Sequence, residues 1–333
     1  MFGFGSCLAS GFSLTYCLLA FTAVGCFAST TPIPVDGLSG KTTDGLDGNL
    51  VYLDNGVIRV GIDLSRGGSI AYLSTSRGAT AATNVINAHD MGREVQLSFY
   101  SGPAFYNPNG RCNKLFHGRE WPWNPIGAGD IKGHHGKTLH HSGNRTHLHV
   151  VTRPLQWACD NVPCDCVFDQ MISLEGNPGN TGVRVEAVLR NNRTDHTPYQ
   201  AQDQELPAVY SNAPYYRLVT FQGGHQKVFD TGFSSQTNFW TPGRFSADEN
   251  WAAMMNKDLT FGMGVVNYNT TTFVGGFSGQ KGHGGSTDPS TGYVSPVAKA
   301  SLPWNAQFSF TFHLVLGDLN TIRSYAHQAR PHV

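Results

Sequence analysis

The chain has 333 residues, and its 23 lysine and arginine residues balance 23 aspartate and glutamate residues, so the formal net charge is zero. This balance argues against a nucleic-acid partner and against attraction to an acidic membrane surface, since both require an excess of positive charge. Charged residues make up only 14% of the chain, and it contains 39 glycines and 17 prolines. Such a composition favours strands and turns over exposed helices.

The N-terminal segment is uncharged and apolar. Residues 1–28 contain no charged side chain, and the run from Leu14 to Val24 is typical of the hydrophobic centre of a signal peptide, with Ala28 at the expected cleavage position. We therefore expect residues 1–28 to direct secretion, residues 29–46 to form a flexible leader, and the mature protein to have no membrane partner. An uncleaved anchor helix is the alternative, because the apolar run is nearly long enough to span a bilayer.

From residue 47 onward, short apolar and β-branched runs alternate with turns rich in glycine, asparagine and proline. The segment NLVYLDNGVIRVGIDLSRGGSIAYLS reads as three strands, two of them joined by a turn at residues 66–68. About a dozen such strands predict an all-β protein with one large antiparallel β-sandwich domain. We expect this single domain to cover residues 47–333, with strands to about residue 319 and a short C-terminal helix over 320–328.

Residues 111–149 interrupt the strand pattern, because they are rich in glycine, histidine, tryptophan and asparagine and show little alternation. We predict a long loop here, and long loops in compact domains usually carry function. The indole faces of Trp121 and Trp123, beside Arg119, are suited to stack on the C–H faces of sugar rings. Packing of both tryptophans into the core is the alternative interpretation.

The same loop carries two further candidates for chemistry. Asp130 is an independent candidate acid or base, and His134 is a candidate substrate-binding or catalytic imidazole. His147 and His149 would share one strand face, as ligands do in some metal sites. No nearby cysteine or glutamate completes a ligand set, so we expect surface histidines, no metal and no cofactor.

Four cysteines remain after the expected cleavage, an even number that predicts two disulfides: Cys112, Cys159, Cys164 and Cys166. Cys164 and Cys166 are not expected to pair with each other, because residues two apart on an extended strand are separated by roughly 6 to 7 Å with parallel side chains. The expected sets are Cys159–Cys164 with Cys112–Cys166, or Cys159–Cys166 with Cys112–Cys164. A zinc site is the alternative, but the spacing matches no common zinc module.

Three Asn-X-Thr sequons predict N-linked glycans if the source is a eukaryote. Their asparagines are Asn144, Asn192 and Asn269.

The segment YQAQDQELPAVY, residues 199–210, carries the main catalytic candidates. On a strand, Asp203 and Glu205 would point from the same face, where like charges split the pKa values of two carboxyl groups. Glu205 adjoins the apolar LPAV segment and is the expected general acid, while Asp203 is expected to stay ionised as its partner. Tyr210 is a candidate substrate contact. The alternative is a solvated strand edge, with salt bridges to neighbouring arginines.

Three segments resemble galactose mutarotase-like (aldose-1-epimerase-like) domains: NGVIRVGIDLSRGGSIAYLS, GVRVEAVLRNNRTDHTPYQAQDQELPAVY and ASLPWNAQFSFTFHLVLG. The resemblance implies a twisted β-sandwich with a carbohydrate ligand in its concave face. Epimerases of this group use a histidine on the returning strand and a glutamate near the C-terminus. Here the returning strand carries Asp203 and Glu205 and no histidine, and the only later glutamate is Glu249. The epimerase pair is therefore not carried over.

These observations predict a secreted glycoside hydrolase that cleaves an extracellular polysaccharide through paired carboxylates. One alternative is a lyase of uronate-containing glycans, in which Tyr210 or His134 abstracts a proton α to the sugar carboxylate. The other is a non-catalytic glycan-binding or cell-wall protein.

Overall fold

The computed structural model describes residues 50–80, 83–102, 104–234 and 239–331. All of them belong to one structural unit, Pro32–Val333. The expected signal peptide (1–28) and leader (29–46) lie outside the described residues. No helix within the described ranges is long and apolar enough to cross a membrane.

The first sheet has ten strands. Eight of them follow in the order β1-β2-β3-β4-β11-β20-β19-β16, while β5 pairs with β4 and β8 pairs with β5. Their bounds are β1 (Leu50–Asp54), β2 (Ile58–Asp63), β3 (Ser69–Thr75), β4 (Val95–Ser98), β5 (Pro125–Ile126), β8 (Leu155–Gln156), β11 (Gln202–Asn212), β16 (Gly243–Ser246), β19 (Thr272–Ser278) and β20 (Thr291–Ala300).

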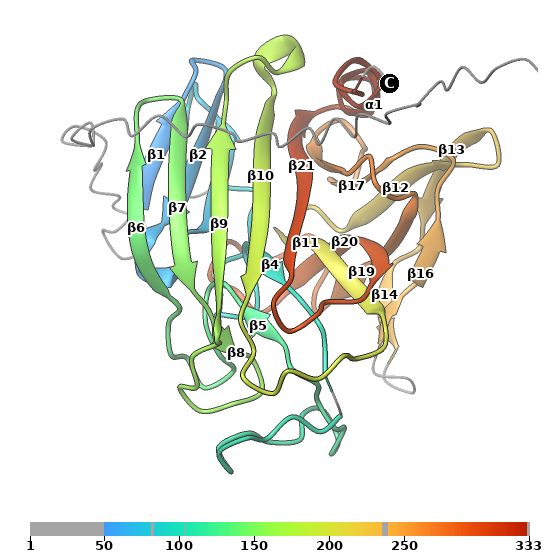
Figure 1. The fold of residues 1–333 in the computed structure, drawn as a ribbon. Coiled ribbons are helices and arrows are strands. Elements are labelled where there is room, and N and C mark those ends of the chain that lie inside the picture. The colour runs from blue at the N-terminus through green and yellow to red at the C-terminus, as the bar shows by residue number, and fades with distance from the viewer. Residues whose placement is uncertain (1–49, 81–82, 103, 235–238, 332–333) are drawn as a thin grey trace, which may run out of the picture. The chain divides into compact units, whose positions relative to one another are not determined.

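The second sheet has nine strands in the order β13-β12-β17-β18-β21-β10-β9-β7-β6. Their bounds are β6 (Lys137–Gly143), β7 (His147–Arg153), β9 (Cys166–Ser173), β10 (Gly182–Asn191), β12 (Arg217–Gln222), β13 (His225–Phe229), β17 (Trp251–Met255), β18 (Gly262–Val266) and β21 (Gln307–Gly317). In Figure 1, β6, β7, β9 and β10 lie side by side, with β1 and β2 of the first sheet behind them.

The remaining elements are short. A two-stranded ribbon pairs β14 (Gly232–Ser234) with β15 (Phe239–Thr241), and two 3-10 turns are η1 (Leu64–Arg66) and η3 (Pro178–Asn180). The helix α1 (Leu319–Gln328) begins after Asp318, whose side chain caps it by accepting the backbone N–H of Thr321. The predicted all-β fold with a C-terminal helix is confirmed.

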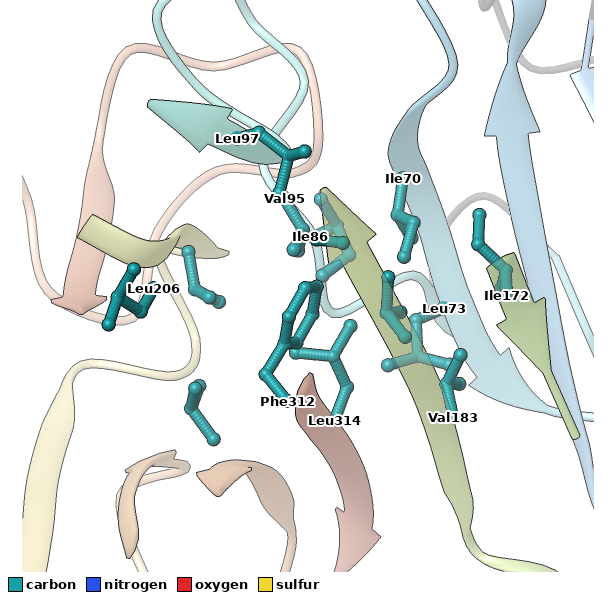
Figure 2. Packing of buried hydrophobic residues seen from close by; sticks show 14 of the residues in the cluster. Ile70, Leu73, Ile86, Val95, Leu97, Ile172, Val183, Leu206, Phe312 and Leu314 are labelled. Atoms are coloured by element: carbon teal, nitrogen blue, oxygen red, sulfur yellow. The ribbon is translucent and has the colours of Figure 1, made fainter. Parts of the chain in front are cut away.

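The core lies between the two sheets because their strands alternate buried and outward residues. In β10, Val183, Val185, Ala187 and Leu189 are buried, whereas Glu186 between them is exposed. These side chains belong to the same buried cluster as residues from β2, β3 and β4 of the first sheet. Figure 2 shows this packing, with Val183 near Leu314. Each fully buried aliphatic or aromatic side chain stabilises the fold by about 1.5–3 kcal/mol.

A second buried cluster fixes the helix on the outer face of the second sheet. Ile322 and Tyr325 of α1 pack with Trp251, Val266 and Val315. These three residues come from β17, β18 and β21, which are consecutive neighbours in the sheet. The helix therefore covers the part of this sheet whose strands are apolar on both faces.

The predicted turn at residues 66–68 joins β2 to β3. Gly67 and Gly68 both have positive φ, 60° and 72°. A Cβ on Gly67 would lie 2.0 Å from the carbonyl oxygen of Gly127, so both conformation and space require glycine at this position.

The loop predicted over residues 111–149 is shorter than expected. Lys137–Gly143 forms β6, which pairs with β7, and Pro125–Ile126 forms β5. The side chains of β6 are mostly exposed, so its sequence KTLHHSG lacks the alternation of apolar and polar residues that marks a half-buried strand. Within the predicted range, residues 111–124 and 127–136 form no strand. The first of these segments belongs to the teal part of the ribbon below β5 in Figure 1.

The prediction of two disulfides is confirmed, but both predicted pairings are wrong. The bridges are Cys112–Cys159 and Cys164–Cys166. The chain bends at Asp165 and the Cα atoms of Cys164 and Cys166 lie 5.0 Å apart, within the range that a disulfide spans. The expectation failed because it assumed an extended strand at this point.

Candidate active site

A bulge in β11 determines which side chains of this strand point away from the core. Between Glu205 and Ala208 the partner strand β4 advances only from Ser98 to Gln96, so β11 contains one extra residue. The bulge includes Pro207, which has no N–H to give to the ladder. Leu206 and Val209 both belong to the core, and Figure 2 shows Leu206 among the core side chains.

The consequence is that Glu205, Ala208 and Tyr210 face the same side. All three line a cavity of about 890 Å³ on the face of the first sheet opposite the core. A regular strand would have placed Tyr210 on the core side with Leu206, because side chains alternate with a period of two. The register shift therefore brings an acid and a tyrosine to one cavity.

The carboxylate of Glu205 is held by two phenols. Tyr100 Oη donates to Oε2 at 3.1 Å, and Tyr293 Oη donates to Oε1. Burial raises the pKa of Glu205, while hydrogen bonds from Ser98, Tyr293 and Tyr100 oppose that rise. The direction is upward, so Glu205 keeps its proton to a higher pH than an exposed glutamate.

The tyrosines around Glu205 remain phenols at neutral pH. Burial, followed by the negative charge of Glu205, raises the pKa of Tyr100, Tyr210 and Tyr293 above the ordinary tyrosine value. A phenol that holds its proton donates hydrogen bonds and does not act as a base. These residues therefore supply donors to a bound ligand or to Glu205.

Aromatic rings form the cavity walls on two sides. On one side the ring centroid of Tyr293 lies 4.9 Å from that of Tyr210 and 5.4 Å from that of Trp240. On the other side the ring centroids of Trp121 and Phe116 are 5.7 Å apart. Flat apolar walls with a small number of polar groups are the usual lining of a small-molecule site.

The rim carries two of the most exposed large apolar side chains among the described residues. Phe116 is 54% exposed and Phe233 is 46% exposed, and both line the cavity. Phe116 comes from the loop before Trp121, whereas Phe233 comes from β14 and lies 5.7 Å from Trp240. Exposed rings at a cavity mouth are typical of a binding surface.

Several predicted site residues meet in this cavity. They are Glu205, Tyr210, Trp121 and Arg119. The Arg119 guanidinium lies 5.8 Å over the ring of Trp121. The loop and β11 are far apart in the sequence, but strand pairing brings them together.

Asp203 lies on the same face of β11 as Glu205 but is not among the cavity-lining residues. It is exposed and forms a salt bridge with Arg244 of β16. The two acids predicted as a pair thus have different surroundings, one in a cavity and one in solvent.

Asp130 is placed away from the cavity. Its buried carboxylate accepts the backbone N–H groups of Lys132, His134 and Asn161, and lies 2.9 Å from His134 Nδ1. These contacts give Asp130 and His134 a role in holding their own loop. Within the described ranges, no group of three or more histidine, cysteine, aspartate or glutamate side chains could hold a metal ion.

Trp123 is also outside the cavity lining. It is 1% exposed and belongs to the main core, with the Arg193 guanidinium 5.6 Å from its ring. The two tryptophans of the loop therefore differ, since Trp121 borders the cavity and Trp123 packs inside.

Sequence reasoning missed Tyr100, Tyr293 and Trp240, which line the cavity beside Glu205 and Tyr210. Tyr293 precedes the buried Val294 in β20, so strand alternation could have assigned it to the outer face. No local signal marks Trp240.

A second cavity, of about 720 Å³, lies by α1 on the outer face of the second sheet and is lined by Tyr268 and His313, among others. Two of its charged side chains, Arg184 and Glu186, form a salt bridge with each other at 2.5 Å. Burial lowers the pKa of His313 to about 4, so the imidazole is neutral at neutral pH. The cavity around Glu205 is therefore the candidate active site.

No protein-family model matches the chain, and a comparison with curated proteins gives no match. The structure is similar to a candidate aldose 1-epimerase from Escherichia coli, with 10% identity, 81% of this chain and 99% of that chain covered, and a TM-score of 0.48. It is also similar to a galactose mutarotase-like protein from Clostridium acetobutylicum, with 8% identity, 81% and 95% coverage, and a TM-score of 0.45.

A third similar structure is a GH36 α-galactosidase from Geobacillus stearothermophilus, with 10% identity and a TM-score of 0.43. The match covers 83% of this chain but only 41% of the α-galactosidase. These solved structures include galactose mutarotase-like proteins, the group that three segments of the sequence resemble.

Proposed function

We propose that this protein is a secreted glycoside hydrolase that binds a saccharide in the cavity and uses Glu205 as its general acid. The observation that carries the proposal is the position of Glu205, whose carboxyl group lies in an aromatic-lined cavity between two tyrosine donors. An acid of raised pKa that faces a ligand-sized space is suited to protonate a glycosidic oxygen. Two disulfides are compatible with export.

Tyr100 and Tyr293 can hydrogen-bond to Glu205 both in its protonated form and in its ionised form. While Glu205 is protonated, its carboxyl oxygens accept from Tyr100 and Tyr293 and its proton is available to the leaving oxygen. Once the proton is transferred, the same phenols stabilise the carboxylate that forms. Positioned acid catalysis of this kind contributes about 10²- to 10⁴-fold to a rate.

We propose Asp203 as the second carboxylate. It lies two residues from Glu205 on the same strand face and is exposed beside Arg244. Inverting glycosidases need about 6.5–9.5 Å between their carboxyl groups so that a water molecule fits between acid and base. A spacing of two strand residues, roughly 6 to 7 Å, is close to that range.

The alternative of a uronate lyase has less support. In that reaction Tyr210 or His134 would abstract a proton. The pKa of Tyr210 is raised by burial and by the charge of Glu205, so the phenolate needed for this step is disfavoured. His134 contacts Asp130 and does not line the cavity.

The rim indicates a ligand longer than one sugar. Phe116 and Phe233 extend the aromatic surface from Trp121 and Trp240 to the solvent. A monosaccharide held near Glu205 would leave these rings exposed, whereas neighbouring sugars of a chain would cover them. We therefore propose an oligosaccharide or polysaccharide substrate.

The test is an assay of the purified mature protein against a panel of polysaccharides. Release of reducing ends without new ultraviolet absorbance is the result expected for a hydrolase. Release with new absorbance identifies an unsaturated lyase product and contradicts hydrolysis. Binding without release of reducing ends contradicts catalysis and favours a glycan-binding protein.

A further inference from the structure

We propose that Asn124 is a positioning residue, whose side-chain amide holds Trp121 of the cavity wall and the proposed acid Glu205 in a fixed relation to each other. The inference rests on the proposed function, since it concerns how that acid is placed beside the ring on which a sugar would stack. Asn124 lines the cavity but is only 1% exposed. Its polar atoms therefore need partners within the protein.

The backbone of Asn124 is anchored to a neighbouring strand. Its N–H donates to Gln156 Oε1 at 3.0 Å, and its carbonyl accepts the N–H of Trp157 at 2.8 Å. Gln156 ends β8, and the residue after Asn124, Pro125, begins β5, which pairs with β8 and with β4. The side chain of Asn124 thus starts from a backbone that three paired strands hold in place.

The hydrogen-bond partners of the Asn124 amide determine which way it faces. Oδ1 accepts the indole N–H of Trp121 at 3.0 Å, and Nδ2 donates to the Phe99 carbonyl at 2.7 Å and to Ser98 Oγ at 3.2 Å. An indole nitrogen only donates and a carbonyl only accepts. Reversing the amide would lose both of these bonds, so the orientation of the indole depends on Asn124.

The same orientation directs the hydroxyl of Ser98 toward the acid. Because Ser98 Oγ accepts from Asn124, its own hydrogen remains for Glu205, which is its partner in the strand register, or for Tyr100. Burial raises the pKa of both Glu205 and Tyr100, and the hydrogen bond of Ser98 opposes that rise in each. Tyr100 in turn donates to Glu205. The donors therefore follow one direction, from the indole through the amide and the hydroxyl to the carboxyl group.

One amide thus places two parts of the candidate site. Trp121 forms a wall of the cavity with Phe116, and Glu205 lines the same cavity. A sugar ring stacked on the indole would lie at a fixed position relative to the carboxyl group. Proton transfer to a glycosidic oxygen requires such fixed geometry.

The inference is tested on the mature protein without a ligand, by two nuclear magnetic resonance measurements. The first is the pH titration of the Glu205 carboxyl carbon in protein that contains isotope-labelled glutamate, with Glu205→Gln to assign the signal. The second is hydrogen exchange of the Trp121 indole N–H, with Trp121→Phe to assign it. In the wild type this indole should exchange at least about fivefold more slowly than that of Trp240. Trp240 lines the same cavity, and its indole has no hydrogen-bond partner among the described residues.

Two variants separate the two ends of the network. Ser98→Ala should raise the pKa of Glu205 but leave the Trp121 indole protected, because Asn124 keeps its other bonds. Asn124→Leu keeps a branched side chain and makes none of the three hydrogen bonds. It should change both measurements, with a higher pKa of Glu205 and an indole exchange that is at least about fivefold faster.

The matched control is Asn191→Leu. Asn191 is also a buried asparagine, 6% exposed, and its amide donates to the Pro303 carbonyl at 2.7 Å away from the cavity lining. A general loss of stability would affect this variant as well. An unchanged Glu205 titration and an unchanged indole exchange in Asn191→Leu therefore assign the changes to Asn124.

Some contrary outcomes need no Asn124 variant, so they decide the matter even if Asn124→Leu does not fold. They are an indole of Trp121 that exchanges as fast as that of Trp240, or a Glu205 titration that is the same in Ser98→Ala as in the wild type. A folded Asn124→Leu that changes only one measurement also overturns the inference. The proposed function is judged separately, by turnover of Glu205→Gln, because neither measurement uses a substrate.

Discussion

The hydroxyl of Tyr100 donates a hydrogen bond of 3.1 Å to Glu205 Oε2, although the two residues are 105 positions apart in the sequence. Tyr100 follows β4, and Glu205 lies in β11, the neighbouring strand of the first sheet. Strand pairing therefore places a donor directly beside the proposed acid, and this donor lowers the pKa of Glu205 against the effect of burial.

Tyr100→Phe removes that donor, so the pKa of Glu205 should rise. A general acid works only while protonated, and the pH at which turnover is lost on the alkaline side should therefore move upward. The pH profile of kcat on an identified substrate measures this shift. Tyr216→Phe, a change of a tyrosine outside the cavity lining, is the control and should leave the profile in place. A downward or absent shift in Tyr100→Phe would contradict the assignment.

Asp203→Asn tests the second carboxylate. If Asp203 activates water, turnover should fall by about 10²-fold or more. Its salt bridge with Arg244 is exposed, so the free energy of unfolding should change by less than about 1 kcal/mol. Arg244→Gln removes the same salt bridge but keeps the carboxylate, and it should retain most of the turnover. Full activity of Asp203→Asn would exclude Asp203 as the base.

Glu94 provides a prediction on stability. Its side chain is fully buried against Arg66 and Ser69, and burial raises its pKa from 4.5 to about 7. Between pH 4.5 and about pH 7, Glu94 is protonated in the folded state but ionised in the unfolded state. The contribution of Glu94 to the free energy of unfolding therefore declines as pH rises through this range. The decline is on the order of 3 kcal/mol.

Glu94→Gln removes the titration, and the difference in unfolding free energy between wild type and variant should therefore change with pH in that window. Urea unfolding at several pH values gives this difference directly. Taking a difference cancels the other titrating groups, among them His313, whose pKa is lowered to about 4 and whose effect has the opposite sign. A difference that is constant with pH would contradict the assignment to Glu94.

The two disulfides should differ in their contribution to stability. Cys112–Cys159 closes a loop with a sequence separation of 47, whereas Cys164–Cys166 spans 2. On the chain-entropy model the long loop is worth about 4 kcal/mol and the short one about 1 kcal/mol. Paired Cys→Ser variants, compared by chemical denaturation, should show this order. Removal of Cys112–Cys159 should also weaken saccharide binding, because that bridge anchors the segment that carries Phe116 and Trp121 of the cavity lining.

The fold could be predicted from local patterns, whereas part of the site could not. In β10 the alternation of Val183, Val185, Ala187 and Leu189 predicts a half-buried strand, and the structure confirms it. Glu205 could be singled out because it is one of few charged residues beside an apolar run. Its partners Tyr100 and Tyr293 could not, since they depend on which strands lie next to β11.

Two local irregularities explain the errors of placement. The bulge between Glu205 and Ala208 changes the face of every later side chain in β11, and a single sequence does not show which strand gains an extra residue. The bend at Asp165 brings Cys164 and Cys166 close enough to pair. In both cases the prediction assumed regular extended geometry where the backbone departs from it.

The three sequon asparagines, Asn144, Asn192 and Asn269, are all exposed. Secretion from a eukaryotic host should therefore add up to three N-linked glycans. Mass spectrometry before and after enzymatic deglycosylation checks the number, with Asn→Gln variants assigning each site. A protein secreted from such a host without any glycan would contradict this prediction.

The most direct test of the central proposal is the turnover of Glu205→Gln on an identified saccharide. This change keeps the shape of the side chain and removes the proton that is transferred. The matched control is Glu186→Gln, an exposed glutamate on the outer face of the second sheet. We predict that Glu205→Gln loses about 10²-fold or more in kcat, with saccharide binding and Tm close to those of wild type, while Glu186→Gln keeps full turnover. Full activity of Glu205→Gln would contradict the account.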